Sequence, residues 1–292
     1  MKIIVSYSGG KDSQACLLYA VNKYGSKNIE AVFCDTGWEH PDTYKHIIDT
    51  TSELNVKLTV LQSEKYKGMV DLAKKRNMFP MTKRRFCTEE LKIKPMTDFI
   101  LKLNDHSIII QGIRKDESIS RSKMQSQCQY FRYYFEPYNE KGKTHTYRKK
   151  EIIEYSKQFE TEIDRPLFTW TSDQVIDYIL QNNQKPNPLY YQGFKRVGCF
   201  PCIMCSHQEV RELIKRYPER MQEITDYENM IGSSFFPPDY IPEYARSAIS
   251  ITNRKKFATA SDVKKYIESK TGTLFAEKEE TFSCSSFYHI CE

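Results

Sequence analysis

The sequence near the amino terminus reads Ile3-Ile4-Val5-Ser6-Tyr7-Ser8-Gly9-Gly10-Lys11-Asp12-Ser13, and this stretch decides the fold. A short β-branched run, a glycine turn and a helical pattern follow one another directly, which predicts a strand-loop-helix unit. Such a loop points backbone N–H groups and the positive end of a helix at one place, and that arrangement suits a phosphate. The two glycines are adjacent and the lysine follows at once, so the loop differs from the GxxxxGK[ST] loop of kinase-like NTPases.

The residues of this loop have predicted roles in binding phosphate. Gly9 and Gly10 can adopt a positive φ and place no Cβ near the anion. Lys11 adds a positive charge, and the hydroxyl groups of Ser8 and Ser13 can donate hydrogen bonds. Taken alone, the same residues also fit a surface turn before a helix.

Length and composition indicate a protein with a sizeable core. Of the 292 residues 39% are hydrophobic, and no apolar run approaches the roughly 20 residues that span a bilayer. We therefore expect one large domain with a smaller appendage and no membrane partner.

Because Met1-Lys2 leads directly into the first strand, no signal peptide is expected and the predicted location is cytoplasmic. The net charge of +6 permits an anionic partner, such as a nucleotide or nucleic acid, without requiring one.

Strand-like and helical segments alternate over the first 125 residues. Strands are predicted at residues 2–5, 29–34, 56–61 and 107–111, and helices at residues 13–23, 41–54 and 92–103. This order predicts an α/β fold with a parallel sheet and helices on both faces. Since ligands of such sheets bind at the carboxyl ends of the strands, the loops after residues 5, 34 and 111 are expected to converge on one cleft.

The later part of the chain is predicted to be mainly helical. Helices are expected after an N-cap at Thr171 or Ser172, at residues 208–230 and at residues 260–270. We place a boundary at residue 165, which gives a nucleotide-binding domain at residues 1–165 and a helical C-terminal region with a cysteine cluster at residues 166–292.

Residues 130–150 combine aromatic and basic side chains. This combination can stack bases and contact phosphates, as in proteins that bind single-stranded nucleic acid. Aromatic runs also form protein cores, and charge runs also form solvated loops. The sequence alone leaves both interpretations open.

Three closely spaced cysteines, Cys199, Cys202 and Cys205, are too dense for independent core packing. Structural disulfides are rare in the cytoplasm, so this clustering favours metal or redox chemistry. Thiolates at this spacing can hold a zinc ion or a [4Fe–4S] cluster. The fourth ligand stays open among four residues of the chain, namely Cys87, His207, Cys284 and Cys291.

The second predicted strand ends in Asp35-Thr36-Gly37. A carboxylate at Asp35 can accept a hydrogen bond from a ribose hydroxyl or bind Mg²⁺. Gly37 would let the backbone approach a base. A simple turn before the next helix explains the same three residues.

Five ordered motifs over residues 1–205 resemble the phosphoadenosine phosphosulfate (PAPS) reductase family of the PP-loop ATP pyrophosphatase superfamily. They are SGGKDS at residues 8–13, DTGWEHP at 35–41, FCTEELKIKP at 86–95, QGIRKDES with Arg121 at 111–121, and the PL, W, NPLY and RVGC elements between residues 166 and 199. The resemblance implies a Rossmann-like fold, similar to that of the adenine nucleotide alpha hydrolases, with a smaller, mainly helical, metal-binding C-terminal part.

The resemblance also implies site roles. In this superfamily the loop binds the pyrophosphate of ATP, and the enzyme cleaves between the α- and β-phosphates to adenylate a substrate. Ser8–Ser13, Asp35–Gly37, Gly112 and Arg121 would therefore bind ATP with Mg²⁺. Lys11, Asp12, Arg114 and Cys87 would be catalytic, with Asp12 either holding Mg²⁺ or capping the helix. The resemblance favours Cys87 as the fourth ligand of the cysteine centre.

Two chemistries occur in the superfamily. Sulfonucleotide reductases carry an E-C-G-[IL]-H signature near the carboxyl terminus, whereas this chain ends in CSSFYHICE at residues 284–292. The intact SGGKDS loop favours ATP cleavage. The expected activity is thus adenylation with pyrophosphate release, coupled to transfer of sulfur from a donor protein to an acceptor such as nucleic acid.

Two alternatives remain at this point. The first is a PAPS or adenylylsulfate reductase that uses Cys284 or Cys291 as its nucleophile. The second is a nucleotide- or nucleic-acid-binding module with a structural zinc ion.

Overall fold

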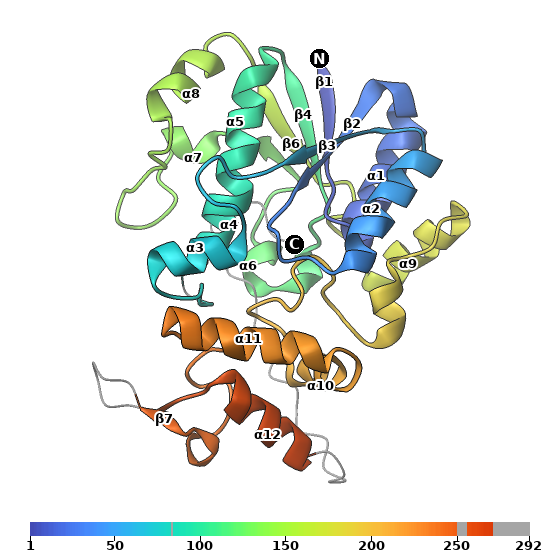
Figure 1. The fold of residues 1–292 in the computed structure, drawn as a ribbon. Coiled ribbons are helices and arrows are strands. Elements are labelled where there is room, and N and C mark those ends of the chain that lie inside the picture. Colours follow the sequence, from blue (N-terminus) through green and yellow to red (C-terminus); the bar gives the residue numbers. More distant parts are fainter. Residues whose placement is uncertain (83, 250–255, 271–292) are drawn as a thin grey trace.

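A six-stranded sheet forms the centre of the computed structural model, which describes residues 1–82, 84–249 and 256–270 (Figure 1). The strand order is β3-β2-β1-β4-β6-β5, and all neighbours are parallel except β5 and β6. The strands are β1 (Lys2–Ser6), β2 (Ile29–Cys34), β3 (Lys57–Leu61), β4 (Ser107–Gln111), β5 (Gln127–Gln129) and β6 (Thr161–Asp164). The predicted parallel α/β architecture is confirmed.

Strand β1 lies in the middle of the sheet because its side chains are apolar on both faces. Val5 pairs in register with Ala31 of β2 and Ile110 of β4. Ile3 and Val5 pack in one core cluster, while Ile4 packs in another on the opposite side. A central strand of a parallel sheet is covered by helices on both faces, so a continuous apolar run such as Ile3-Ile4-Val5 is favoured there.

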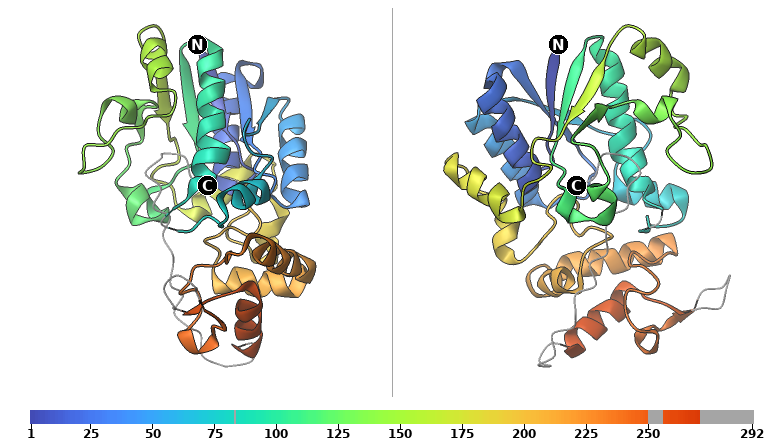
Figure 2. Two further views of the ribbon diagram at one scale, coloured as in Figure 1. Left: turned by 60° about the vertical axis from the view of Figure 1, so that its left-hand side comes forward. Right: turned by 180° about the vertical axis from the view of Figure 1, so that it is seen from behind.

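The helices of the sheet domain form two layers (Figures 1 and 2). One face carries α1 (Lys11–Tyr24), α2 (Pro41–Glu53) and α9 (Ser172–Gln181), and the other carries α5 (Lys94–Leu103), α7 (Arg132–Phe135) and α8 (Lys149–Ser156). Shorter helices in the loops are α3 (Met69–Arg76), α4 (Phe86–Thr88) and α6 (Ile119–Ser122). A π-helical stretch, Glu89–Ile93, joins α4 to α5, so helical structure begins before the predicted residue 92.

A third layer of helices lies beneath the carboxyl ends of the strands (Figures 1 and 2). It contains α10 (His207–Arg216), α11 (Pro218–Ile231), α12 (Ala260–Lys270) and a short antiparallel pair, β7 (Ala248–Ile249) and β8 (Lys256–Phe257). The prediction of one helix over residues 208–230 is wrong. Tyr217 leaves the helical region at φ −135° because Pro218 follows it, and Pro218 begins the second helix without a backbone N–H.

Residues 126–165 contain two strands that the sequence analysis did not predict. Phe131 and Tyr134 are buried in the core beside α5 and α8, so packing accounts for these two aromatic residues, whereas Phe135 is 51% exposed. The helix after the predicted N-cap is confirmed, since the Thr171 side chain accepts from the Gln174 backbone N–H. That helix packs on α1 through Val175 and Ile179. The domain boundary at residue 165 stays a prediction.

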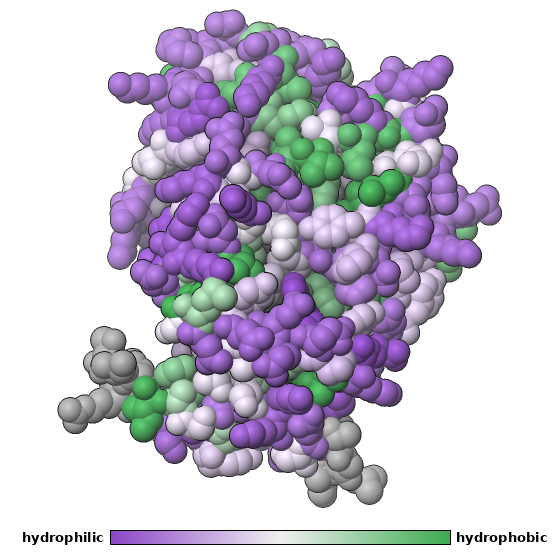
Figure 3. Space-filling model, viewed as in Figure 1, coloured by the Kyte–Doolittle hydropathy of each residue, from purple (hydrophilic) through white to green (hydrophobic). Residues whose placement is uncertain are grey.

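The surface on the side shown in Figure 3 is largely hydrophilic, with apolar residues gathered in its upper part. Val60 of β3 and Ile48 of α2 are among the exposed apolar side chains. Over the ranges that the structure covers, no helix has the length and apolar character needed to cross a membrane.

Trp38 connects the loop after β2 to the helical layer. Its side chain is 1% exposed, and the indole N–H donates to the Pro201 carbonyl over 2.9 Å. The Arg220 guanidinium lies 3.7 Å from the ring centroid, a cation–π contact, and Phe235 packs against the same ring.

We expect Trp38→Ala to lower the free energy of unfolding by about 3–5 kcal/mol, because a large buried side chain and its contacts are lost. Urea denaturation followed by circular dichroism measures the change. Tyr191→Ala, at a position 71% exposed, is the control and should change it by less than about 0.5 kcal/mol. Equal effects of the two substitutions would show that Trp38 does not hold the layers together.

Candidate active site

The phosphate loop connects β1 to α1 and is closed by its serine hydroxyls. Ser13 Oγ donates to the Gly10 carbonyl over 3.0 Å and accepts from the Ser8 backbone N–H over 3.2 Å. Gly9 has φ +77°, and a Cβ there would lie 2.9 Å from Ile47. Gly10 has φ −83°, so the positive φ expected of both glycines is found only at Gly9.

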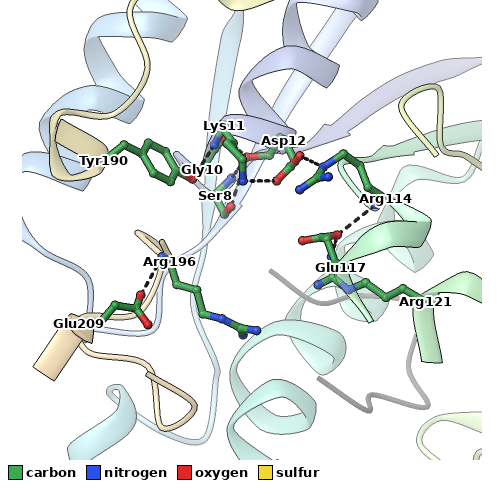
Figure 4. A network of polar contacts seen from close by, with 11 residues as sticks. Ser8, Gly10, Lys11, Asp12, Arg114, Glu117, Arg121, Tyr190, Arg196 and Glu209 are labelled. Atoms are coloured by element: carbon green, nitrogen blue, oxygen red, sulfur yellow. Dashed lines mark hydrogen bonds and ion pairs between the residues drawn. The ribbon is translucent and has the colours of Figure 1, made fainter. Parts of the chain in front are cut away.

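Asp12 is the centre of the charge arrangement at this loop (Figure 4). It is 3% exposed, and its carboxylate pairs with Lys11 Nζ at 3.1 Å and with Arg114 Nε. It does not cap α1, whose N-cap residue is Gly10 and makes no side-chain capping bond. Two cations therefore compensate the buried carboxylate.

The loop after β4 lies directly against the phosphate loop. A Cβ on Gly112 would be 2.6 Å from the Asp12 carbonyl carbon and from the Ser13 nitrogen, so only glycine fits without a shift. Glu117 accepts from the Arg114 backbone N–H at 3.0 Å and pairs with Arg121. The loops after β1 and β4 thus converge, and they bring Lys11, Asp12, Arg114 and Arg121 together.

The Asn-Pro-Leu-Tyr segment also contacts the phosphate loop. Asn187 is fully buried and donates to the Gly9 carbonyl at 3.2 Å and to Thr43 Oγ1 at 3.1 Å. The Tyr190 hydroxyl accepts from the Lys11 backbone N–H at 2.9 Å. The sequence analysis used these residues only as a motif and did not assign them to the site.

A cavity of about 950 Å³ opens beside these loops. Its walls include Lys11, Arg114 and Arg121 from the sheet domain and Arg196 and Glu209 from the later part of the chain. A cavity of this size, with convergent charged groups at the carboxyl ends of parallel strands, is the expected place for a ligand.

Among the residues that the structure describes, those of the loop after β2 do not line this cavity. Asp35 accepts from the Gly37 backbone N–H at 2.8 Å and from the Tyr44 hydroxyl at 2.7 Å. Thr36 donates to Glu39 at 2.6 Å, and Gly37, at φ +61°, lines a smaller separate cavity of about 330 Å³. The roles of Asp35, Thr36 and Gly37 in binding the nucleotide stay predictions.

The cysteine segment is attached to the loop after β2. Cys199 pairs with Glu39 through an isolated antiparallel bridge, and its Sγ is 3.9 Å from Thr36 Oγ1. Burial raises the pKa of Glu39, although the charge of Lys92 and the hydrogen bond from Thr36 act in the opposite direction. This attachment brings the cysteines beneath the carboxyl ends of the strands.

The four predicted metal ligands are neighbours. One core cluster contains or contacts all four of them, namely Cys87, Cys199, Cys202 and Cys205. Negative charge on Cys202 or Cys87 acts to raise the pKa of the Cys199 thiol, which shows that the three lie near one another. Burial raises the pKa of Cys87 to about 11 and that of Cys199 to about 12.

These residues do not form a metal site as they stand. Among the residues that the structure describes, no group of three or more His, Cys, Asp or Glu side chains is arranged to hold a metal ion. His207 Nε2 lies 2.8 Å from the Tyr240 carbonyl oxygen, and Cys284 and Cys291 lie outside the described residues. The donor set is suitable in type and number, but its placement does not fit a bound metal.

Comparison with known proteins decides the family. The sequence profile of the phosphoadenosine phosphosulfate reductase domain matches residues 2–205. The chain belongs to this family. An uncharacterized 37.8 kDa protein of Escherichia phage 186 is 28% identical over 99% of this chain and 96% of its own length. An adenosine 5′-phosphosulfate reductase of Oceanobacillus iheyensis is 28% identical over 60% of this chain and 61% of its own length.

The chain is also similar to a solved structure. The phosphoadenylyl-sulfate reductase of Candida auris, in complex with phosphate, is 17% identical, with a TM-score of 0.47 over 69% of this chain and 83% of its own. The recognition of the PAPS reductase family from the five motifs is therefore confirmed by the family match.

The sequence predicts that this loop binds ATP, and we expect Gly112→Ala to weaken that predicted binding roughly tenfold or more, because the added methyl group would push the β4 loop away from Asp12 and Ser13. Isothermal titration calorimetry with ATP measures this effect. Gly198→Ala is the matched control for stability, since a methyl group there meets no protein atom within 4 Å, and its unfolding temperature should match that of the wild type. Unchanged ATP affinity in Gly112→Ala would contradict the close approach.

Proposed function

We propose that this protein is an ATP-dependent adenylating enzyme, which releases pyrophosphate and passes sulfur to an acceptor. The main support is the complete phosphate loop, whose Lys11 and Asp12 form one charge network with Arg114 of the loop after β4. The start of α1, the serine hydroxyls and the two cations together suit the polyphosphate of a nucleotide.

In the proposed reaction the acceptor attacks the α-phosphorus of ATP. The bond from the α-phosphorus to the bridging oxygen of the β-phosphate breaks, and pyrophosphate leaves with that oxygen and its electron pair. In the second step a sulfur nucleophile supplied by the donor attacks the adenylated acceptor, and AMP leaves with the oxygen that joined it to the acceptor and with that bond's electron pair. Lys11 and Arg114 stabilise the negative charge that develops on the leaving group. Asp12 holds both cations in place, since its carboxylate contacts each of them.

We further propose that Mg²⁺ enters together with ATP. Both carboxylates predicted to bind it, Asp12 and Asp35, already accept hydrogen bonds from protein donors. When bound to the phosphates, Mg²⁺ spreads their charge.

A sulfonucleotide reductase is the second candidate. It is favoured by the similarity to the Oceanobacillus iheyensis reductase. Its nucleophile would be Cys284 or Cys291. The third interpretation, a binding module with a structural zinc ion, requires neither reaction.

We expect Lys11→Ala to reduce pyrophosphate release from ATP by about 100-fold or more, because a preorganised charge at the leaving group is lost. Chromatography of AMP and pyrophosphate, with single-stranded nucleic acid present as a trial acceptor, measures the reaction. Lys27→Ala, an exposed lysine near the end of α1, is the control and should retain full activity.

A parallel assay supplies labelled adenosine 5′-phosphosulfate and thioredoxin and measures sulfite. Sulfite formation without ATP cleavage would overturn the adenylation proposal in favour of the reductase. A protein that does neither, yet binds polyanions with a steep dependence on salt, would be a binding module.

The predicted [4Fe–4S] centre at Cys87, Cys199, Cys202 and Cys205 is tested by the element content of protein purified without oxygen. A bound [4Fe–4S] centre requires these cysteines to rearrange from the described placement, and it would give iron and sulfide in equal amounts, both lost in Cys202→Ser and retained in Cys16→Ala, a cysteine buried in the other core. One zinc ion per chain without iron would support the alternative zinc site. Protein with neither metal would rule out a resident centre.

A further inference from the structure

One buried arginine, Arg165, lacks a carboxylate partner. It directly follows β6 and is only 1% exposed. Over the described part of the chain, no Asp or Glu side chain acts on this guanidinium, and its Nε–H has no hydrogen-bond acceptor. Burial lowers the pKa of Arg165, yet a guanidinium stays protonated in proteins. A charge buried in this way is costly unless an anion lies beside it.

The side-chain partners of Arg165 are two amide oxygens and one thiol. Nη2 donates to Gln111 Oε1 at 3.0 Å, and Nη1 donates to the Gln125 carbonyl oxygen. Nη1 also donates to Cys128 Sγ at 3.7 Å. Of these three acceptors only the thiol can take a negative charge. A thiolate at Cys128 would therefore supply the counter-charge that the buried guanidinium lacks.

Other cations add to the positive charge around Cys128. The pKa of Arg132 in α7 is raised mainly by its hydrogen bond to Glu136, and Cys128 acts in the same direction, so the thiol lies near a second guanidinium. Arg121 acts on Arg165 as a like charge. Positive charge beside a cysteine favours the thiolate, which is the nucleophilic form.

Cys128 is partly open to solvent. It is the middle residue of β5, the edge strand of the sheet, and its neighbours Gln127 and Gln129 are exposed. Asp164, which pairs in register with Gln127, accepts from the Gln127 side chain at 3.5 Å and does not pair with Arg165. A partly exposed cysteine among cations is the environment typical of reactive thiols.

We propose that Cys128 is a nucleophilic modification site, which the buried guanidinium of Arg165 activates for reaction with small disulfides. In this step Sγ attacks one sulfur of the disulfide and forms a new S–S bond. The original S–S bond breaks, and one half leaves as a thiolate with the electron pair. The proton lost from Cys128 passes through solvent to that thiolate, so the exchange is balanced. Neither Cys128 nor Arg165 belongs to the described lining of the large cavity, so the site is separate from the proposed function.

The test exposes the full chain to glutathione disulfide at pH 7 and follows the mixed disulfide at each cysteine by mass spectrometry of peptides. We expect Cys128 to react about tenfold or more faster than Cys34. Cys34 is the internal reference, because its thiol donates to the Lys92 carbonyl at 3.6 Å and burial raises its pKa to about 12. Each site is measured separately, so reaction at other cysteines does not affect the comparison.

The arginine variants test the activation. We expect Arg165→Gln to slow the reaction at Cys128 about tenfold, whereas Arg165→Lys keeps the charge and should retain most of the rate. Arg211→Gln, at an exposed position of α10, is the matched control and should react like the wild type. Thermal unfolding shows whether each variant is folded. Arg132→Gln removes the more exposed charge, leaves the buried cluster in place and should slow the reaction about twofold or more.

Two results would overturn the proposal. One is a reaction at Cys128 that is no faster than that at Cys34. The other is a fast reaction at Cys128 that keeps its rate in every folded variant of Arg165 and Arg132, since exposure alone would then explain it. If Arg165→Gln does not fold, the rate in Arg132→Gln decides the outcome.

Discussion

The burial of one carboxylate, that of Asp12, is the constraint on which the site depends. A buried charge is costly unless it is paired, and removing either partner of such a pair leaves an uncompensated charge. Asp12 meets this requirement with Lys11, its neighbour in the chain, and Arg114, which lies beyond β4. The pairing holds the loops after β1 and β4 in contact, and Gly112 supplies the space that this contact needs.

A second set of contacts fixes the cysteine segment to the sheet domain. The Phe200 backbone N–H donates to the Trp38 carbonyl at 2.8 Å, and the Trp38 indole donates back to Pro201. The Thr43 hydroxyl donates to the Val197 carbonyl at 2.8 Å. The site is therefore built from both parts of the chain, with the phosphate loop on one side and residues 195–209 on the other.

The fold could be predicted from the sequence where the signal is local. Ile3-Ile4-Val5 and the glycine turn specify the central strand and the start of α1 without reference to the rest of the chain. Strand β6 was missed because it has only two buried side chains, Thr161 and Ile163, and depends on pairing with β4. For the site, Lys11 and Arg114 followed from the motifs, whereas the positions of Asn187, Tyr190 and Glu209 depend on contacts between residues far apart in the sequence.

The hydrogen bond from the Lys11 N–H to Tyr190 has a thermodynamic consequence for ligand choice. A backbone N–H serves mainly one strong acceptor, so a ligand oxygen that takes this donor displaces the phenol. A neutral oxygen would replace one neutral acceptor with another and gain little. A charged phosphate oxygen forms a bond roughly twice as strong, so the exchange favours it. At this one donor, the exchange of Tyr190 for a ligand oxygen therefore favours a charged oxygen over a neutral one.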